Sequence, residues 1–160
     1  MGAAAQVGEL LEDYAGRGVF SGFSRRETRG GNGEYRLRWH RKQLFQWQWN
    51  ERRQTLRISC VLPAVPAGSA MYRELKAWLR GRQDAALPDH RRCDPDKVGL
   101  RTYNRGGEVA LTLQVLDGDV EYAARKLLAL VNEIYLDFLS SGLYYDWLLE
   151  TFELDPDNPY

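Results

Sequence analysis

Residues that commonly bind metals or attack substrates are sparse in this chain. It contains two histidines, His40 and His90, and two cysteines, Cys60 and Cys93. His90 and Cys93 are spaced as His-x-x-Cys, but a structural zinc site needs four ligands in paired clusters, and arginines stand between these two residues. Cys60 lies in an apolar alternating segment, where burial disfavours the reactive thiolate. The sequence therefore predicts no metal site, no nucleophile and no bound cofactor.

Carboxylates occur in two close pairs, Asp94 with Asp96 and Asp117 with Asp119. Acid–base catalysis would require one member of a pair to lie in an apolar pocket that raises its pKa. The first pair flanks a proline in a loop and the second precedes a helix, so turn and capping roles are favoured. The glycine-rich run at 30–33 precedes a strand and lacks the Lys-Ser/Thr of a phosphate-binding loop. An enzyme whose site is assembled from residues distant in sequence stays open as an alternative.

Basic residues concentrate in the first half of the chain and acidic residues in the second, although the net charge is zero. The two halves either neutralise each other or leave a basic surface exposed. Polar residues alternate with the apolar ones in three expected strands: Arg36, Arg38, His40, Gln46, Gln48 and Arg57. A nucleic-acid-binding face would use the arginines there and in a nearby turn to neutralise phosphates: Arg36, Arg38, Arg52, Arg53 and Arg57. Because no aromatic residues that could stack on bases interleave with them, nucleic-acid binding is the second choice of function.

Aromatic residues on two expected helices suggest a surface for a protein partner. The helices at 69–80 and 143–154 carry more large aromatic side chains than one buried stripe can absorb, and protein interfaces favour tyrosine and tryptophan. The candidate partner-binding residues are Trp78, Tyr144, Tyr145 and Trp147. The alternative is that these side chains pack between helix and sheet.

The first half of the chain changes from helical to strand periodicity. Apolar residues at helical spacing predict a helix over 5–15, and the basic, glycine-rich segment 21–33 is expected to be a loop. Period-two alternation then predicts three strands, which place Trp39, Trp47 and Trp49 on one apolar face. A four-residue turn aligns Trp47 with Ile58, whereas the hairpin before it needs an odd turn length or a bulge to keep Trp39 on that face.

For the second half, the sequence predicts a helix, a long loop, one hairpin and two further helices. Ser69 is the expected N-cap of the helix at 69–80, and residues 82–97 read as a long loop. A hairpin with its turn at 104–107 would pair Tyr103 with Glu108 and Leu100 with Leu111. A long helix over 122–139, the further helix over 143–154 and a frayed end at 155–160 complete the chain.

Length and composition fit one domain. The chain has 160 residues with 44% hydrophobic and 28% charged residues, which is typical of a single globular domain. Charges interrupt every apolar run, so no membrane span is expected, and the N-terminal residues lack the features of a signal peptide. We expect a cytoplasmic α+β domain over residues 1–160, with an antiparallel sheet of about five strands and helices on one face.

The predicted order, α-β-β-β-α-β-β-α plus a C-terminal helix, resembles the type III secretion chaperone-like fold over roughly Val7 to Leu139. That group includes the secretion chaperones and YbjN-type bacterial proteins. The basic first half and the extension at 143–154 depart from the secretion chaperones, so the YbjN-type proteins are the nearer likeness. The resemblance implies a non-enzymatic protein, often a homodimer, that binds another polypeptide, for example by strand addition at a sheet edge.

Overall fold

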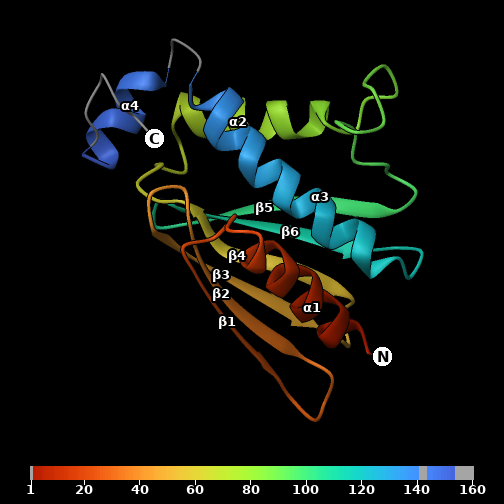
Figure 1. Cartoon of the computed structure of the whole chain (residues 1–160). Coiled ribbons are helices and arrows are strands. Elements are labelled where there is room, and N and C mark those ends of the chain that lie inside the picture. The colour runs from red at the N-terminus through yellow and green to blue at the C-terminus, as the bar shows by residue number, and fades with distance from the viewer. Residues whose placement is uncertain (1, 141–143, 154–160) are drawn as a thin grey trace.

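Alternating apolar and polar residues form an antiparallel sheet of six strands, in the order β1-β2-β3-β4-β6-β5 (Figure 1). The computed structural model describes residues 2–140 and 144–153. The strands are β1 (Gly22–Glu27), β2 (Gly33–Trp39), β3 (Gln43–Asn50), β4 (Thr55–Leu62), β5 (Val98–Arg105) and β6 (Glu108–Val115). Helices cover one face of the sheet, so the predicted α+β class is confirmed, with one strand more than the five expected.

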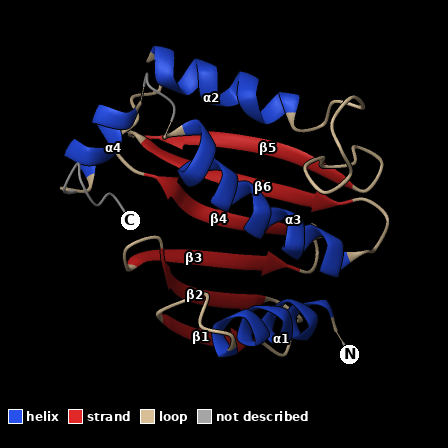
Figure 2. Ribbon diagram, turned by 45° about the horizontal axis from the view of Figure 1, so that its top comes forward, coloured by secondary structure: helices blue, strands red, loops and turns tan. Residues whose placement is uncertain are grey.

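The described helices all lie on the same side of the sheet (Figures 1 and 2). They are α1 (Ala3–Gly16), α2 (Ala70–Gly81), α3 (Val120–Glu133), the π-helical turn η1 (Ile134–Phe138) and α4 (Tyr145–Thr151). Figure 2 shows α1 over β1 and β2, α3 crossing β4 and β6, and α2 beside β5. The helix predicted over 122–139 corresponds to α3 and η1, and α4 lies within the predicted extension. The expected frayed end at 155–160 lies outside the described residues.

The segment 21–33 was wrongly predicted to be a loop, because it contains the edge strand β1. The strand was hidden because two of its residues on the helix side, Arg25 and Glu27, are charged rather than apolar. They form an ion pair with each other, and Arg25 also pairs with Glu12 of α1 at 2.9 Å. Gly8 of α1 leaves the space for this guanidinium, since a Cβ there would lie 2.6 Å from Arg25 Nε. Charge compensation under α1 therefore replaces the apolar pattern that identifies a strand.

The register of the central strands agrees with the prediction. Trp47 pairs with Ile58, and Trp49 pairs with Leu56. Both tryptophans are only 1% exposed on the helix side, and Trp39 is half-buried on the same side. The hairpin between β2 and β3 has the predicted odd turn length, because Trp39 pairs with Gln43 and leaves three residues, 40–42, in the turn. All three turn residues have positive φ, between 48° and 68°.

The hairpin of β5 and β6 has a different register from the one predicted. Arg105 pairs with Glu108, and Leu100 pairs with Leu113 instead of Leu111. The turn is the two-residue Gly106-Gly107, both with positive φ, which matches the twist of the strands better than a four-residue turn. Because the register shift is two residues, the apolar side chains stay on the predicted face.

Tyr135 lies where the pairing between strands β3 and β4 ends. Strands β3 and β4 pair only over 47–50 and 55–58, and a register shift follows in β4 between Ile58 and Leu62. Tyr135 of η1 fills this region, where its hydroxyl lies 2.8 Å from the Val61 carbonyl oxygen on β4 and 3.0 Å from Gln43 Oε1 on β3. The π-helical turn therefore sets the tyrosine where it joins the two halves of the sheet.

We expect Ser69, the predicted N-cap of α2, to stabilise the protein. Ser69 Oγ accepts a hydrogen bond from the Tyr72 amide at 3.2 Å, which satisfies one free N–H of the first helical turn. The change Ser69→Ala should lower the free energy of unfolding by about 1 kcal/mol in urea titrations, whereas Ser69→Asp should retain most of it. Equal stability of the alanine variant and the wild type would contradict this role.

Candidate functional site

The face of the sheet opposite the helices carries a set of arginines that we call the basic sheet face: Arg26, Arg36, Arg38, Arg57, Arg101 and Arg105. Strand pairing aligns one residue from each strand in a row that crosses the whole sheet: Arg26, Glu34, Gln48, Arg57, Thr112 and Arg101. Side chains opposite each other in a sheet share a face, so the row places arginines from β1, β4 and β5 on the same surface. None of the described helices covers it (Figure 1).

Most arginines of the basic sheet face have no partner among the described residues. Arg26 lies 4.0 Å from Glu34, and Arg38 donates to the Lys42 carbonyl at 3.1 Å. No ion pair or side-chain hydrogen bond within the described chain engages the remaining four: Arg36, Arg57, Arg101 and Arg105.

Four arginines on the helix-bearing side behave differently. Arg17, Arg25, Arg82 and Arg125 each pair with a carboxylate. Only two carboxylates, Glu34 and Glu108, lie among the described residues of the basic sheet face, against its six arginines. The excess positive charge of the first half of the chain is thus partly displayed on one open surface.

The structure brings together some of the arginines proposed for a nucleic-acid face. Arg36, Arg38 and Arg57 lie on the basic sheet face, while Arg52 and Arg53 are exposed in the turn between β3 and β4. Sequence reasoning missed Arg101 and Arg105, although they follow the same alternation in β5 as the arginines in β2. Arg26 joins this face from β1, a strand that lies in the segment predicted to be a loop.

His40 was wrongly assigned to this polar face. The strand alternation stops at Trp39, and the left-handed turn directs the imidazole toward the helix side. There it stacks on Tyr135, with ring centroids 4.6 Å apart and planes at 12°. Its Nε2 atom is buried and has no hydrogen-bond partner in the described chain, and burial lowers the pKa of the imidazole to about 4.

The middle of the basic sheet face offers no platform for stacking. Within the described sheet, Trp47 and Trp49 are buried on the other side, and the large apolar side chains exposed on this face are Leu44 and Tyr103. Tyr103 is 61% exposed but lies on the edge strand β5. The surface can therefore supply charge and hydrogen bonds, with one aromatic ring at its margin.

The aromatic residues proposed for partner binding gather at one end of the helical layer. Trp78 and Tyr144 both contact Phe138 of η1, with ring centroids 5.8 and 5.0 Å apart. Trp147 donates its indole N–H to the Ala64 carbonyl at 3.4 Å. These three residues are half-buried and pack against the core, and Tyr145 is half-buried as well. Much of the aromatic surface predicted for a partner is thus used within the fold.

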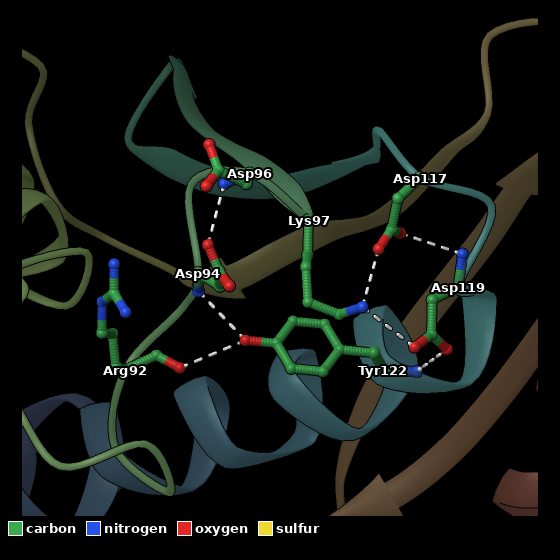
Figure 3. A network of polar contacts seen from close by, with 7 residues as sticks. All are labelled: Arg92, Asp94, Asp96, Lys97, Asp117, Asp119 and Tyr122. Carbon is green, nitrogen blue, oxygen red and sulfur yellow. Dashed lines mark hydrogen bonds and ion pairs between the residues drawn. The ribbon is translucent and has the colours of Figure 1, made fainter.

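Hydrogen bonds to α3 hold the loop at 82–97 in place. Figure 3 shows the Tyr122 hydroxyl accepting a hydrogen bond from the Asp94 amide at 3.0 Å and donating to the Arg92 carbonyl at 3.4 Å. Lys97 Nζ pairs with Asp117 at 2.6 Å and with Asp119 at 3.2 Å. The hydrogen bond from Lys97 lowers the pKa of the Asp117 carboxyl. These contacts give the network an evident role in anchoring the loop.

The other residues with possible chemistry are engaged in local structure. Asp119 Oδ1 caps α3 through the Tyr122 amide at 3.1 Å, as predicted, and Asp94 Oδ1 accepts from the Asp96 amide at 2.9 Å. Within residues 2–140 and 144–153, no group of three or more His, Cys, Asp or Glu side chains is placed to hold a metal ion.

Cys60 and Cys93 differ in burial, but the pKa of each thiol is raised. Cys60 falls in the register shift of β4, so it is half-buried rather than aligned with Leu56 and Ile58 in the core, and burial together with Glu108 raises its pKa. Cys93 is buried, which raises its pKa to about 11. Both shifts disfavour the thiolate that a nucleophile would require.

Among the parts of the chain that the structure describes, no helix has both the length and the apolar character to cross a bilayer. No protein-family model, curated protein or solved structure matches the chain. The resemblance to secretion chaperones and YbjN-type proteins therefore stays a prediction.

Proposed function

We propose that the chain is a non-enzymatic binding module that holds another polypeptide against the basic sheet face. The observation that carries the proposal is the group of arginines on the open face that have no ion-pair partner in the described chain, such as Arg36, Arg57 and Arg101, whereas four arginines on the helix side each pair with a carboxylate. Guanidinium groups bind carboxylates through two parallel hydrogen bonds, so a surface that presents several of them complements an acidic polypeptide.

Nucleic-acid binding is the second candidate, because the same arginines would also neutralise phosphates. Single-stranded nucleic acids usually gain affinity from bases that stack on aromatic side chains. Leu44, the glutamines at 46 and 48, and Thr112 occupy the described central strands of the face, and the single exposed ring is Tyr103 at its edge. This composition favours hydrogen bonds to an acidic polypeptide.

The homodimer and the cytoplasmic location implied by the resemblance belong to the same proposal. Two copies cannot join through the basic sheet face without bringing like charges together, so a homodimer would use another surface. Leu136 on η1 is 52% exposed and lies on the helical side. The free thiols of Cys60 and Cys93 fit a reducing compartment.

The proposal is tested by measuring how the full chain binds a fluorescent polyglutamate peptide and labelled single-stranded and duplex oligonucleotides, by anisotropy at physiological salt. We expect the peptide to bind more tightly than either oligonucleotide. The triple change Arg36→Gln, Arg57→Gln and Arg101→Gln should weaken peptide binding by roughly a hundredfold, since each of the three lost charge-assisted pairs costs on the order of 1 kcal/mol.

The matched control removes the same charge elsewhere, through Arg17→Gln, Arg91→Gln and Arg125→Gln. Arg17 and Arg125 make exposed ion pairs, whose loss costs little stability. This variant should bind the peptide within about twofold of the wild type. Tighter binding of an oligonucleotide, no binding of the peptide, or an equal loss in both triple variants would overturn the proposal.

A further inference from the structure

The edge strand β5 presents backbone groups that no described residue engages. The two-residue turn makes Arg105 and Glu108 a hydrogen-bonded pair. The backbone groups of every second residue before Arg105 therefore bond to β6, and those of the residues between them point away from the sheet. Among the outward residues, Val98 offers its carbonyl to Gln83 Nε2 at 3.2 Å. No hydrogen bond within the described chain satisfies the outward groups of Leu100 and Thr102. An exposed edge of this kind is a template for another strand.

A groove runs beside this edge, between β5 and α2. It has a volume of about 220 Å³ and is lined by Lys76, Leu79, Arg80, Gln83, Leu100 and Thr102. Leu79 and Leu100 provide apolar surface, and the two charged lining residues are both cations. Arg80 has no partner in the described chain, and Lys76 lies over the Tyr72 ring, with its Nζ 4.7 Å from the ring centroid. The groove is suited to apolar side chains that carry or adjoin negative charge.

The opposite face of the same edge has the same sign of charge. Arg101 and Arg105 flank Tyr103 there, on the basic sheet face. A strand added to β5 would direct alternate side chains into the groove and onto these three residues. Cations therefore line both sides of the open edge, and no described carboxylate lines the groove.

From this arrangement we propose that the partner binds β5 by strand addition, as an extended acidic segment whose alternate apolar side chains enter the groove beside α2. The inference rests on the proposed function and names the partner's conformation and place. The segment's backbone would bond to Leu100 and Thr102, and its carboxylates would pair with Arg101 and Arg105.

The other free edge of the sheet and a second copy of the chain fit less well. β1 has charges of both signs, and Arg25 and Glu27 already pair with each other. A second copy that paired β5 with β5 would set Arg101 and Arg105 against their own equivalents, which like-charge repulsion opposes. Charge complementarity thus selects an acidic partner and the β5 edge.

The test uses the full chain, labelled with ¹⁵N, and a peptide of alternating glutamate and valine, matched in length to the eight residues of β5. A peptide of the same composition with its glutamates and valines in separate blocks serves as the comparison. We expect the alternating peptide to slow hydrogen exchange of the Leu100 and Thr102 amides by about tenfold or more, because they become hydrogen-bonded. Gly99 and Arg101, whose amides face β6, should change much less.

A pair of variants tests the backbone contribution. Thr102→Pro removes an outward N–H at an edge position, where proline is tolerated, and should weaken binding of the alternating peptide by about tenfold. Thr102→Val retains the N–H but loses the hydrogen bond that Thr102 Oγ1 accepts from the Tyr72 hydroxyl at 3.4 Å, so it should weaken binding much less than Thr102→Pro does.

The failures of the two proposals are distinguishable. Polyglutamate binding that depends on Arg36, Arg57 and Arg101, without protection of Leu100 and Thr102, would overturn the strand addition and leave the proposed function standing. Equal binding of the alternating and block peptides would also overturn it. If neither acidic probe binds, both proposals fall. If the Thr102→Pro variant does not fold, protection of the Leu100 and Thr102 amides in the wild type decides whether the peptide binds by strand addition.

Discussion

The change Gly33→Ala should lower the free energy of unfolding by about 3 kcal/mol, from the strain of an overpacked core and a weakened hydrogen bond. A Cβ at residue 33 would overlap the hydroxyl oxygen of Tyr35 and would lie 2.6 Å from its Cζ. Tyr35 is fully buried, and its hydroxyl donates to the Ala4 carbonyl of α1. The ring therefore cannot move aside without breaking its hydrogen bond to α1. Urea unfolding followed by tryptophan fluorescence measures the loss.

The control is a glycine in the same hairpin. A Cβ at Gly30 would meet its nearest neighbour, Thr28 Oγ1, at 4.0 Å, so Gly30→Ala should change the stability by no more than about 0.5 kcal/mol. In the double variant Gly33→Ala with Tyr35→Leu, the two losses should be less than additive, because the shorter side chain removes the clash. A Gly33→Ala protein as stable as the wild type would show that the ring does not lie over the glycine.

A second large effect is expected from pH, through His40. Burial lowers the pKa of this imidazole from 6.5 to about 4 in the folded protein. Between these two values the unfolded chain binds a proton that the folded chain does not, so stability falls as the pH drops from about 6.5 to about 4. At about 1.4 kcal/mol per unit of pKa, the loss approaches about 3 kcal/mol at the lower limit. Below about pH 4 both states are protonated and this contribution no longer changes.

The variant His40→Phe isolates this contribution, because phenylalanine retains the stack on Tyr135 and cannot bind a proton. Its stability should decline less than that of the wild type between pH 6.5 and pH 4, and the difference between the two proteins should approach about 3 kcal/mol. His90→Phe, in the exposed loop, should follow the wild type. Parallel curves for His40→Phe and the wild type would refute a buried, neutral His40. Guanidinium titrations at a series of pH values provide the measurement.

Period-two alternation predicted the faces of the strands that it identified. Trp47 and Trp49 lie under the helices because a side chain's face in a strand depends only on the parity of its position. The same parity predicted the odd turn between β2 and β3. The caps at Ser69 and Asp119 were also predictable, since capping uses only a side chain and an amide three residues later.

Predictions failed where the determining contact was not local. β1 was missed because Arg25 is neutralised by Glu12, a residue on a separate helix. His40 was misplaced because three left-handed residues redirect it onto Tyr135, which is distant in sequence. The register of the β5–β6 hairpin depended on which glycines form the turn, and a slip of two residues leaves the hydrophobic pattern unchanged.

By itself the sequence determined an α+β domain with an antiparallel sheet, buried tryptophans and arginines on the opposite side, because alternation and capping act between neighbours in the chain. Only the tertiary structure decided which arginines lack partners and where an edge stays open. Arg57 and Arg101 share a row because β6 lies between their strands, and the groove beside β5 exists because α2 packs next to it. Pairing and exposure depend on segments that the chain brings together only when it folds.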